Sequence, residues 1–332
     1  MRFRKTVAVA LALLPMLAGV STATAAPPPP PTDTVSPQIV GGNPAPVAYA
    51  GAGSLQLLDH GDPNWHSCGL TLLAEGYTET GAPASVGFTQ GHCLSNLPTQ
   101  AEQARMPAEV KARFESLRAA AGDPDIDRSD PRLYHARFGS TNRLQGGVVR
   151  HGTKIDVPQE WKWGYPDAEG WIWDVALIRL DGHLDGIRPA RIAPAQLRQS
   201  ARSIGWGTRN VDPTTWTGPA PTDLSQLDIP LLPAKKCAAG GIGGGELCGG
   251  VPPTGGAPCS GDSGSALLQK HGTTWYLIGT VSRGATPYCG SSPTIYNNVS
   301  AYGPWIAQHV RQLLPGKPQA TTHLAVATTP GS

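Results

Sequence analysis

The sequence predicts an all-β fold, either a barrel or a sandwich, from its many turn residues and its short strand-like runs. Glycine (41 residues) and proline (33 residues) favour frequent turns over long helices. Apolar and β-branched residues form runs at 54–58, 85–88, 147–149, 175–180, 203–204, 227–229, 265–268 and 276–281. Many short strands at close spacing are typical of β-barrels and sandwiches.

Two segments, 99–121 and 302–314, show helical spacing instead. The apolar residues on one helical face are Met106, Val110, Phe114 and Leu117 in the first and Trp305, Ile306, Val310 and Leu313 in the second. Pro315 and Gly316 are expected to end the second helix.

The first 38 residues are predicted to lie outside the fold. Arg2, Arg4 and Lys5 precede an apolar run at 7–20 and small residues at 21–25, the pattern of a secretory signal peptide cut after Ala25. Residues 26–38 are proline-rich and are expected to form an extended leader. At the other end, 315–332 has little to bury and is expected to be a flexible tail. No other segment reaches membrane-spanning length, so we expect a soluble, secreted, extracellular protein.

Charge and cysteine content exclude several classes of partner. The formal net charge is +2 and no block of like charge occurs, so neither nucleic acid nor a membrane surface is expected to bind. Six cysteines in an exported chain favour disulfides over metal ligands, and none forms a C-x-x-C pair. We therefore expect no metal and no cofactor. The alternative is that Asp123, Asp125, Asp127 and Asp130 gather calcium, but they lack the glycine and final glutamate of the hand-type loop, which favours a solvated turn. The spacing alone leaves the cysteine pairing open.

Three short segments contain the residue types of nucleophilic catalysis. Ser263 lies among small residues in Cys-Ser-Gly-Asp-Ser-Gly-Ser (259–265), which suits a nucleophile on a tight turn or an ordinary Gly-Ser turn. A serine needs a base, and His92 in Gly-His-Cys is a candidate, although a single histidine is more often structural. Asp174 begins an apolar run and needs hydrogen-bond donors, from a histidine or from backbone amides.

Taken together, these segments resemble the chymotrypsin-like (trypsin-type) serine proteases, and in particular secreted actinobacterial members. The blocks of resemblance, in the family's order, are 39–42 (Ile-Val-Gly-Gly), 91–93, 174–180, 205–207 (Gly-Trp-Gly), 261–264, 281–284 and 300–306. The resemblance implies a peptidase domain at 39–314 with two antiparallel six-stranded β-barrels, about 39–187 and 188–314. It also implies a C-terminal helix, and the 99–121 segment is then a helical insertion after the catalytic histidine.

The resemblance also implies a role for each site residue. Ser263 is the nucleophile, His92 the general base and Asp174 the acid that orients it. The amides of Gly261 and Ser263 form the oxyanion hole, and Ser282 supports the aspartate. The implied disulfides are Cys68–Cys93, Cys237–Cys248 and Cys259–Cys289.

Activation by cleavage before Ile39 is implied in the same way. The new α-amino group of Ile39 would pair with the buried carboxylate of Asp262, and 26–38 would be a propeptide. The alternative is that Asp262 bonds only to local amides and that the leader is inert.

Specificity follows from the residues expected around the substrate pocket. Ala257 is expected at the base, and Thr294 on a wall facing Gly284, which predicts small or medium uncharged side chains at the cleaved position. Arg283 replaces a tryptophan that usually lines the cleft, and it would either favour acidic substrate side chains or point to solvent. Gln90 departs from the family's usual alanine and is expected to be peripheral.

The predicted function is a secreted serine endopeptidase that acts on protein or peptide substrates. We expect the enzyme to be a monomer and proteinaceous inhibitors to be possible partners. The main alternative is a catalytically silent homologue that binds a partner through the cleft, and a third is an esterase with the same triad. The insertion is either packed beside the cleft or a lid or exosite that limits substrates.

Overall fold

The computed structural model describes residues 39–118, 126–212, 219–286 and 288–316. The predicted signal peptide (1–25), the predicted propeptide (26–38) and residues 317–332 of the predicted tail lie outside the described residues. The described residues all fall within one compact unit, residues 36–332.

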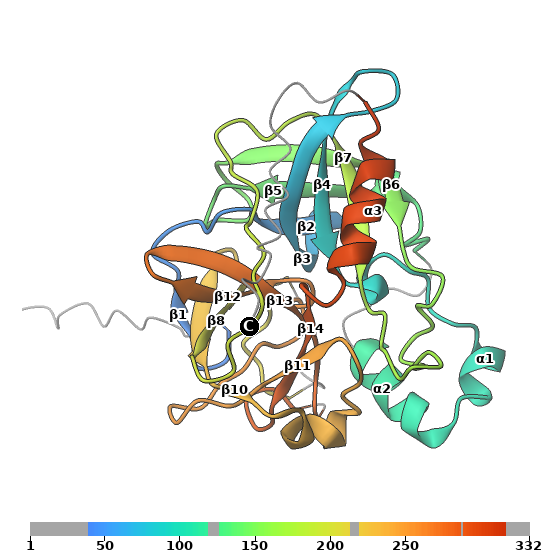
Figure 1. The fold of residues 1–332 in the computed structure, drawn as a ribbon, viewed down its shortest axis with the longest axis vertical. Helices are drawn as coiled ribbons and strands as arrows, with labels where there is room; N and C mark the ends of the chain where they lie inside the picture. Colours follow the sequence, from blue (N-terminus) through green and yellow to red (C-terminus); the bar gives the residue numbers. More distant parts are fainter. Residues whose placement is uncertain (1–38, 119–125, 213–218, 287, 317–332) are drawn as a thin grey trace, which may run out of the picture. The chain divides into compact units, whose positions relative to one another are not determined.

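Six antiparallel strands form a closed barrel in the first half of the chain (Figure 1). They are β2 (Ala52–Asp59), β3 (Asp62–Tyr77), β4 (Pro83–Thr89), β5 (Tyr134–Phe138), β6 (Val148–Asp156) and β7 (Ala176–Asp181), in the order β2-β3-β4-β7-β6-β5. Leucines of β2 and β3 pack inside against Phe138 and Ile178, all essentially inaccessible to solvent. Alternation of inward apolar residues along each strand produces this core.

The second β body is an eight-stranded antiparallel sheet. Its strands are β1 (Asn43–Pro44), β8 (Ala201–Gly205), β9 (Ser225–Ile229), β10 (Leu231–Leu232), β11 (Glu246–Gly249), β12 (Ala266–His271), β13 (Thr274–Gly284) and β14 (Thr294–Asn298). The order is β1-β9-β8-β12-β13-β14-β11-β10. The predicted all-β class with two β bodies is confirmed. The second body differs from a closed six-stranded barrel, because two-residue strands flank its six longer strands and its described ends do not pair with each other.

In the described residues, three α-helices accompany the strands: α1 (Gln100–Ala104), α2 (Ala108–Arg118) and α3 (Gly303–Leu313). The single helix predicted at 99–121 is therefore wrong in the described part, where Pro107 separates α1 from α2. Proline disfavours helical backbone at the residue before it and has no N–H to donate. The predicted apolar face persists, since Val110, Phe114 and Leu117 are buried. None of the helices in the described residues is both long and apolar enough to cross a bilayer.

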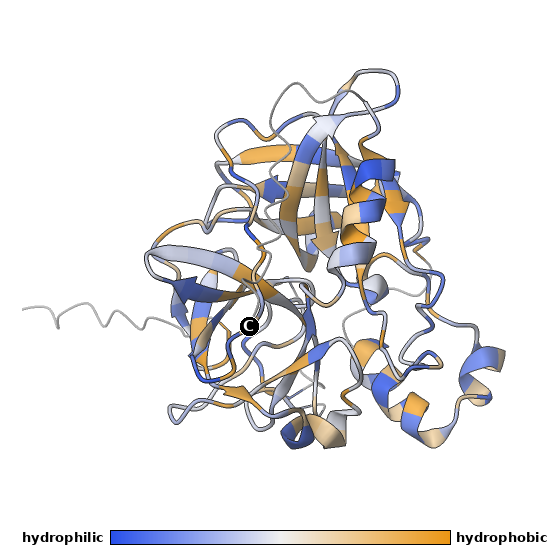
Figure 2. Cartoon of the chain, in the orientation of Figure 1, coloured by the Kyte–Doolittle hydropathy of each residue, from blue (hydrophilic) through white to orange (hydrophobic). Residues whose placement is uncertain are grey.

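One hydrophobic core joins the barrel, the sheet and α3. Phe88 of β4 and Leu177 of β7 belong to the same buried cluster as Leu277 of β13. Ile306 and Val310 of α3 complete it, and Figure 2 shows hydrophobic and hydrophilic residues alternating around this helix. The two β bodies are thus packed directly against each other, which places residues of both around one site.

Candidate active site

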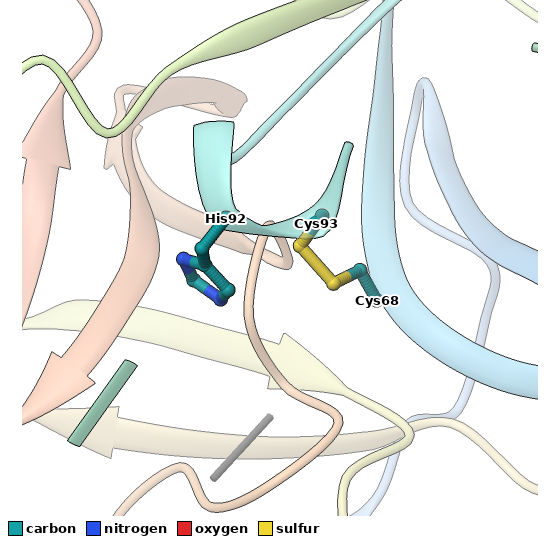
Figure 3. A group of neighbouring side chains, drawn as sticks. All are labelled: Cys68, His92 and Cys93. Carbon is teal, nitrogen blue, oxygen red and sulfur yellow. A yellow bond between two sulfur atoms is a disulfide. The ribbon is translucent and has the colours of Figure 1, made fainter. Parts of the chain in front are cut away.

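His92 lies on a one-turn helix, η1 (Gly91–Cys93), directly after β4. The next residue, Cys93, forms a disulfide with Cys68 of β3, as Figure 3 shows. Ligand atoms of Cys68, His92 and Cys93 lie within 4.8 Å of one another, but the two sulfurs are bonded to each other and are not thiolates that would hold a metal. The disulfide therefore anchors the turn that carries His92.

Gln90 attaches the same turn to the second β body. Its side chain is fully buried, and its amide donates to the carbonyl oxygens of Thr280 (3.1 Å) and Val281 in β13. The expectation that Gln90 is peripheral was wrong. A glutamine here supplies hydrogen bonds across the junction between barrel and sheet, which an alanine could not make.

Asp174 and His92 form a fully buried pair. A carboxylate oxygen of Asp174 accepts from the backbone N–H of His92 (2.9 Å), and both oxygens lie within 3.0 Å of Nδ1. Because a carboxylate only accepts hydrogen bonds, Nδ1 carries the proton. When the ring carries no second proton, Nε2 has its lone pair available to take one.

Ser282 and Asn297 complete the surroundings of Asp174. Ser282 donates its hydroxyl to the carboxylate (2.7 Å), and the Asn297 side chain donates to the backbone carbonyl of Asp174. Burial by itself raises the pKa of Asp174, but the charge of His92 and the hydrogen bonds from His92 and Ser282 lower it below its ordinary value. The acid therefore stays ionised beside the ring.

Ser263 lies on a tight turn just before β12. The amide of Gly69 donates to the carbonyl of Ser263 (2.6 Å), and the amide of Gly264 donates to Val281 (2.9 Å), so β3 and β13 both hold the turn. Gly264 has φ +78°, and a Cβ there would lie 2.2 Å from the Thr89 hydroxyl, which explains the glycine.

The predicted oxyanion-hole amides and the predicted base are unengaged in this structure. Within the described residues, the backbone N–H groups of Gly261 and Ser263 donate to no acceptor. Nε2 of His92 is buried and has no partner there, so the structure does not join His92 to Ser263 by a hydrogen bond. Catalytic hydrogen bonds are often long in free enzymes and tighten in the substrate complex.

The carbonyl of Gly261 is held by a buried polar network that sequence analysis missed. Gln56 donates to the hydroxyl of Ser54 (2.9 Å), which lies 2.8 Å from Nδ1 of His66. The other ring nitrogen of His66 donates to Gly261 O (2.8 Å). Burial, with the nearby Arg143 charge, lowers the pKa of His66 to about 3, so the ring is neutral. The polar residues Ser54 and Gln56, two apart in an apolar strand, were the available signal.

Asp262 is buried beside the nucleophile without a cationic partner among the described residues. Its carboxylate accepts from the backbone N–H groups of Gly207 (2.8 Å) and Cys259 (2.9 Å). Burial raises its pKa to about 7. The side chain of Ile39 is already buried, and Val40 accepts from the Ala257 amide (3.1 Å). No described hydrogen bond joins Ile39 to Asp262.

A pocket of about 270 Å³ opens at Ser263 and contains the residues predicted to line it. Ala257, Gly284 and Thr294 all face this pocket, and Thr294 is the cross-strand partner of Gly284. The other predicted disulfides, Cys237–Cys248 and Cys259–Cys289, are present, and the latter lies in the pocket wall.

Arg283 also borders the pocket, but its side chain does neither of the things predicted. The guanidinium is fully buried and forms two bonds to the carboxylate of Glu246 (2.5 and 2.9 Å). It also donates to the carbonyls of Gly240 and Gly241. Burial by itself lowers the pKa of Arg283, and the charge and hydrogen bonds of Glu246 raise it. The cation therefore reaches neither substrate nor solvent.

Known proteins of one family resemble this chain. The sequence model of the family described as "Trypsin" matches residues 131–306, a range that includes Asp174 and Ser263 and begins after His92. A "Chymotrypsin-like serine proteinase" of Haliotis rufescens is 27% identical over 283 residues, 82% of this chain and 91% of the relative. "Trypsin-1" of Astacus astacus is 32% identical over 143 residues, 40% of this chain and 58% of the relative. "Phenoloxidase-activating factor 1" of Holotrichia diomphalia is 34% identical over 154 residues, which is 42% of this chain and 40% of the relative.

Proposed function

The chain belongs to the trypsin family of serine proteases, and from that premise we propose that it is an active, secreted serine endopeptidase made as a zymogen. The observation that carries the proposal is the buried pair of Asp174 and His92, which leaves Nε2 of the ring as a base. We also propose that the enzyme is monomeric and resembles secreted actinobacterial members of the family. Its substrates would be proteins or peptides, and proteinaceous inhibitors would bind to it.

In the proposed reaction, Ser263 Oγ attacks the carbonyl carbon of the scissile bond while its proton passes to Nε2 of His92. The tetrahedral intermediate collapses when His92 returns that proton to the leaving amine, and an acyl ester remains on Ser263. Water then attacks the ester along the same path, with its proton taken by His92, and releases the acid and the Ser263 hydroxyl. Asp174 stabilises the imidazolium in both halves.

The amides of Gly261 and Ser263 supply the other contribution to this reaction. Both are unengaged in the described residues, and the bond from His66 to Gly261 O holds the peptide unit between Gly261 and Asp262, which lies between these two amides in the chain. Preorganised donors of this kind stabilise the oxyanion of the intermediate, and losing one typically costs about 10²–10³ in kcat.

Substrate preference follows from the pocket beside Ser263. Ala257, Gly284 and Thr294 line this pocket, and we expect the methyl group of Ala257 at its base and Thr294 on one wall. Of the two charged side chains in the described lining, Arg283 is buried against Glu246 and Glu115 is paired with Arg118 on α2. We therefore expect small or medium uncharged side chains at the cleaved position. Cleavage of a peptide library dominated by Arg or Lys at that position would refute this.

Activation by cleavage before Ile39 is supported by the state of Asp262. A carboxylate with its pKa raised to about 7 is stabilised by any cation that reaches it, and cleavage creates an ammonium group on Ile39. Residues 26–38 would then be the propeptide.

The direct test is the intact mass of the secreted protein before and after treatment with a fluorophosphonate, with Ser263→Ala as the matched control. A single adduct on a chain that begins at Ile39, absent from the variant, is the expected result. No adduct on a chain that begins at Ile39 would refute activity and favour the silent homologue. No adduct on a chain that begins at Ala26, together with an adduct after cleavage before Ile39, would establish the zymogen.

A further inference from the structure

Helix α2 of the insertion reaches the substrate pocket. Glu115 and Ser116 line the same pocket as Ser263 and Ala257, although they lie far away in the sequence. The hydroxyl of Ser116 donates to the carbonyl oxygen of Gly284 at the end of β13 (3.3 Å). The insertion therefore contributes two polar side chains to the place where substrates are expected to bind.

The helix is built into the molecule as a wall. Phe114 and Leu117 are buried against Trp161 and Trp163, on the segment that leads to Asp174. On the same helix, Arg113 donates to the carbonyl of Gly164 (2.6 Å). An aromatic contact between Phe114 and Trp163 adds to this packing (centroids 5.7 Å apart). A helix held on its apolar face in this way is a fixed part of the cleft, so a mobile lid is the weaker of the two alternatives that the sequence left open.

The bond to Gly284 occupies a position suited to substrate backbone. The amide of Ala285 donates to Pro293 on the β14 side, so the preceding carbonyl, that of Gly284, points to the opposite edge of β13. Extended peptides bind such edges by adding a strand with main-chain hydrogen bonds. Here the hydroxyl of Ser116 already takes this acceptor.

Glu115 gives this wall its charge. Among the described residues that line the pocket, the charged side chains are Glu115 and Arg283, and Arg283 is fully buried against Glu246. The Glu115 side chain is 44% exposed and pairs with Arg118 one turn along α2 (2.9 Å). An exposed carboxylate at the rim can exchange this partner for a basic group of a ligand.

We infer that Glu115 and Ser116 are specificity-determining residues of the proposed peptidase. The hydroxyl of Ser116 occupies the Gly284 carbonyl that the substrate backbone would otherwise use. The backbone of residues more than two positions upstream of the cleaved bond therefore adds little to binding. Glu115 selects a basic side chain at the second or third residue before that bond. This inference depends on the proposed peptidase function, because it concerns how the same cleft selects peptides.

The charge of Glu115 is tested with four-residue peptide substrates that share the cleaved residue and carry Lys or Glu at the second or third position before the bond. The quantity measured is the ratio of kcat/KM for Lys to that for Glu. We expect a ratio of roughly two to five for the natural enzyme, the range of exposed ion pairs, and a ratio near or below one for Glu115→Lys. Glu109→Lys, exposed on the same helix and outside the pocket lining, is the matched control and is expected to leave the ratio unchanged.

A ratio that does not respond to Glu115→Lys, or that responds equally to Glu109→Lys, would overturn the inference while leaving the proposed function intact. If no peptide is cleaved although Ser263 is present and the chain begins at Ile39, the proposed function fails and this inference with it.

The role of Ser116 is tested by substrate length. We expect kcat/KM to rise less than about threefold when two residues are added upstream of a two-residue substrate, and to rise more steeply in Ser116→Ala, which frees the Gly284 carbonyl. Alanine preserves the helix, so a structural effect would lower the rates of short and long substrates equally. A rise above tenfold in the natural enzyme, or the same length dependence in both proteins, would overturn this part.

Discussion

Ionisation of Asp262 is predicted to destabilise the uncleaved chain, and the size of the effect follows from its burial. The carboxyl group has a pKa raised from 3.8 to about 7 in the folded chain, where two backbone amides are its donors. Each pKa unit corresponds to ~1.36 kcal/mol, so this difference is on the order of 4 kcal/mol. Below pH 4 both folded and unfolded chains are protonated at this residue, and it contributes nothing to the pH dependence.

Between pH 4 and pH 7 the unfolded chain ionises at Asp262 while the folded chain does not. The folded state then binds more protons, so the free energy of unfolding falls as the pH rises, and above pH 7 the full loss is reached. Cleavage before Ile39 would bring an ammonium group to the carboxylate and lower its pKa. The cleaved chain is therefore predicted to lack this loss.

The assay is urea unfolding from pH 3.5 to 8 of the uncleaved chain, with Ser263→Ala to prevent self-cleavage, beside the same chain with Asp262→Asn. Asparagine has a single acceptor oxygen and so loses one of the two hydrogen bonds from backbone N–H groups at every pH. This loss shifts its free energy of unfolding by a constant, so the test is the difference between the two proteins in how that free energy changes with pH. We expect the natural chain to lose about 4 kcal/mol relative to the variant between pH 4 and 7. Parallel curves would refute the reasoning, because the other titrating groups, His66 included, are common to both proteins.

Two further predictions concern buried polar groups. Glu246→Gln should lower the free energy of unfolding by about 3–5 kcal/mol, because the guanidinium of Arg283 stays buried without its counter-charge. Urea unfolding measures this, with Glu169→Gln at an exposed position as the control. A loss below ~1 kcal/mol would contradict the prediction. His66→Gln should make the free energy of unfolding fall less steeply with acid. The folded ring of His66 has a pKa of about 3, so the natural chain loses stability as the pH falls from 6.5 towards 3. Equal slopes of the free energy of unfolding in both proteins between pH 6.5 and pH 4 would contradict this.

The strands with clean apolar patterns were predictable, and the polar ones were not. The predicted run at 175–180 overlaps β7 (Ala176–Asp181), whose inward residues face the barrel interior, as an apolar pattern predicts. In contrast, β3 (Asp62–Tyr77) was missed over its whole length, because its first half contains Asn64, His66 and Ser67. His66 is buried only because Ser54 and Gly261 provide its partners, and no local pattern contains that information.

The candidate site shows the same division. His92, Asp174 and Ser263 each lie in a short sequence context that suggested their chemistry, and the geometry of His92 and Asp174 is that of an oriented base. Gln90 was misjudged because its hydrogen bonds go to β13, about 190 positions away. Contacts of this separation depend on how the barrel and the sheet pack, which spacing along the chain does not reveal.

The replacement at Arg283 and the helical insertion are best understood as one change to the cleft. The resemblance implied a tryptophan in the cleft at the position of Arg283, and this chain has no such apolar wall there, since the arginine side chain turns inward to Glu246. The space beside Gly284 is then lined by Glu115 and Ser116 of α2. Burial lowers the pKa of Arg113 on the same helix, and the charge of Arg283 lowers it further. Arg113 and Arg283 are therefore also close to each other behind the pocket surface. Because the arginine is turned inward and the helix lines the space beside Gly284 in its place, we expect the two features to change together in related chains.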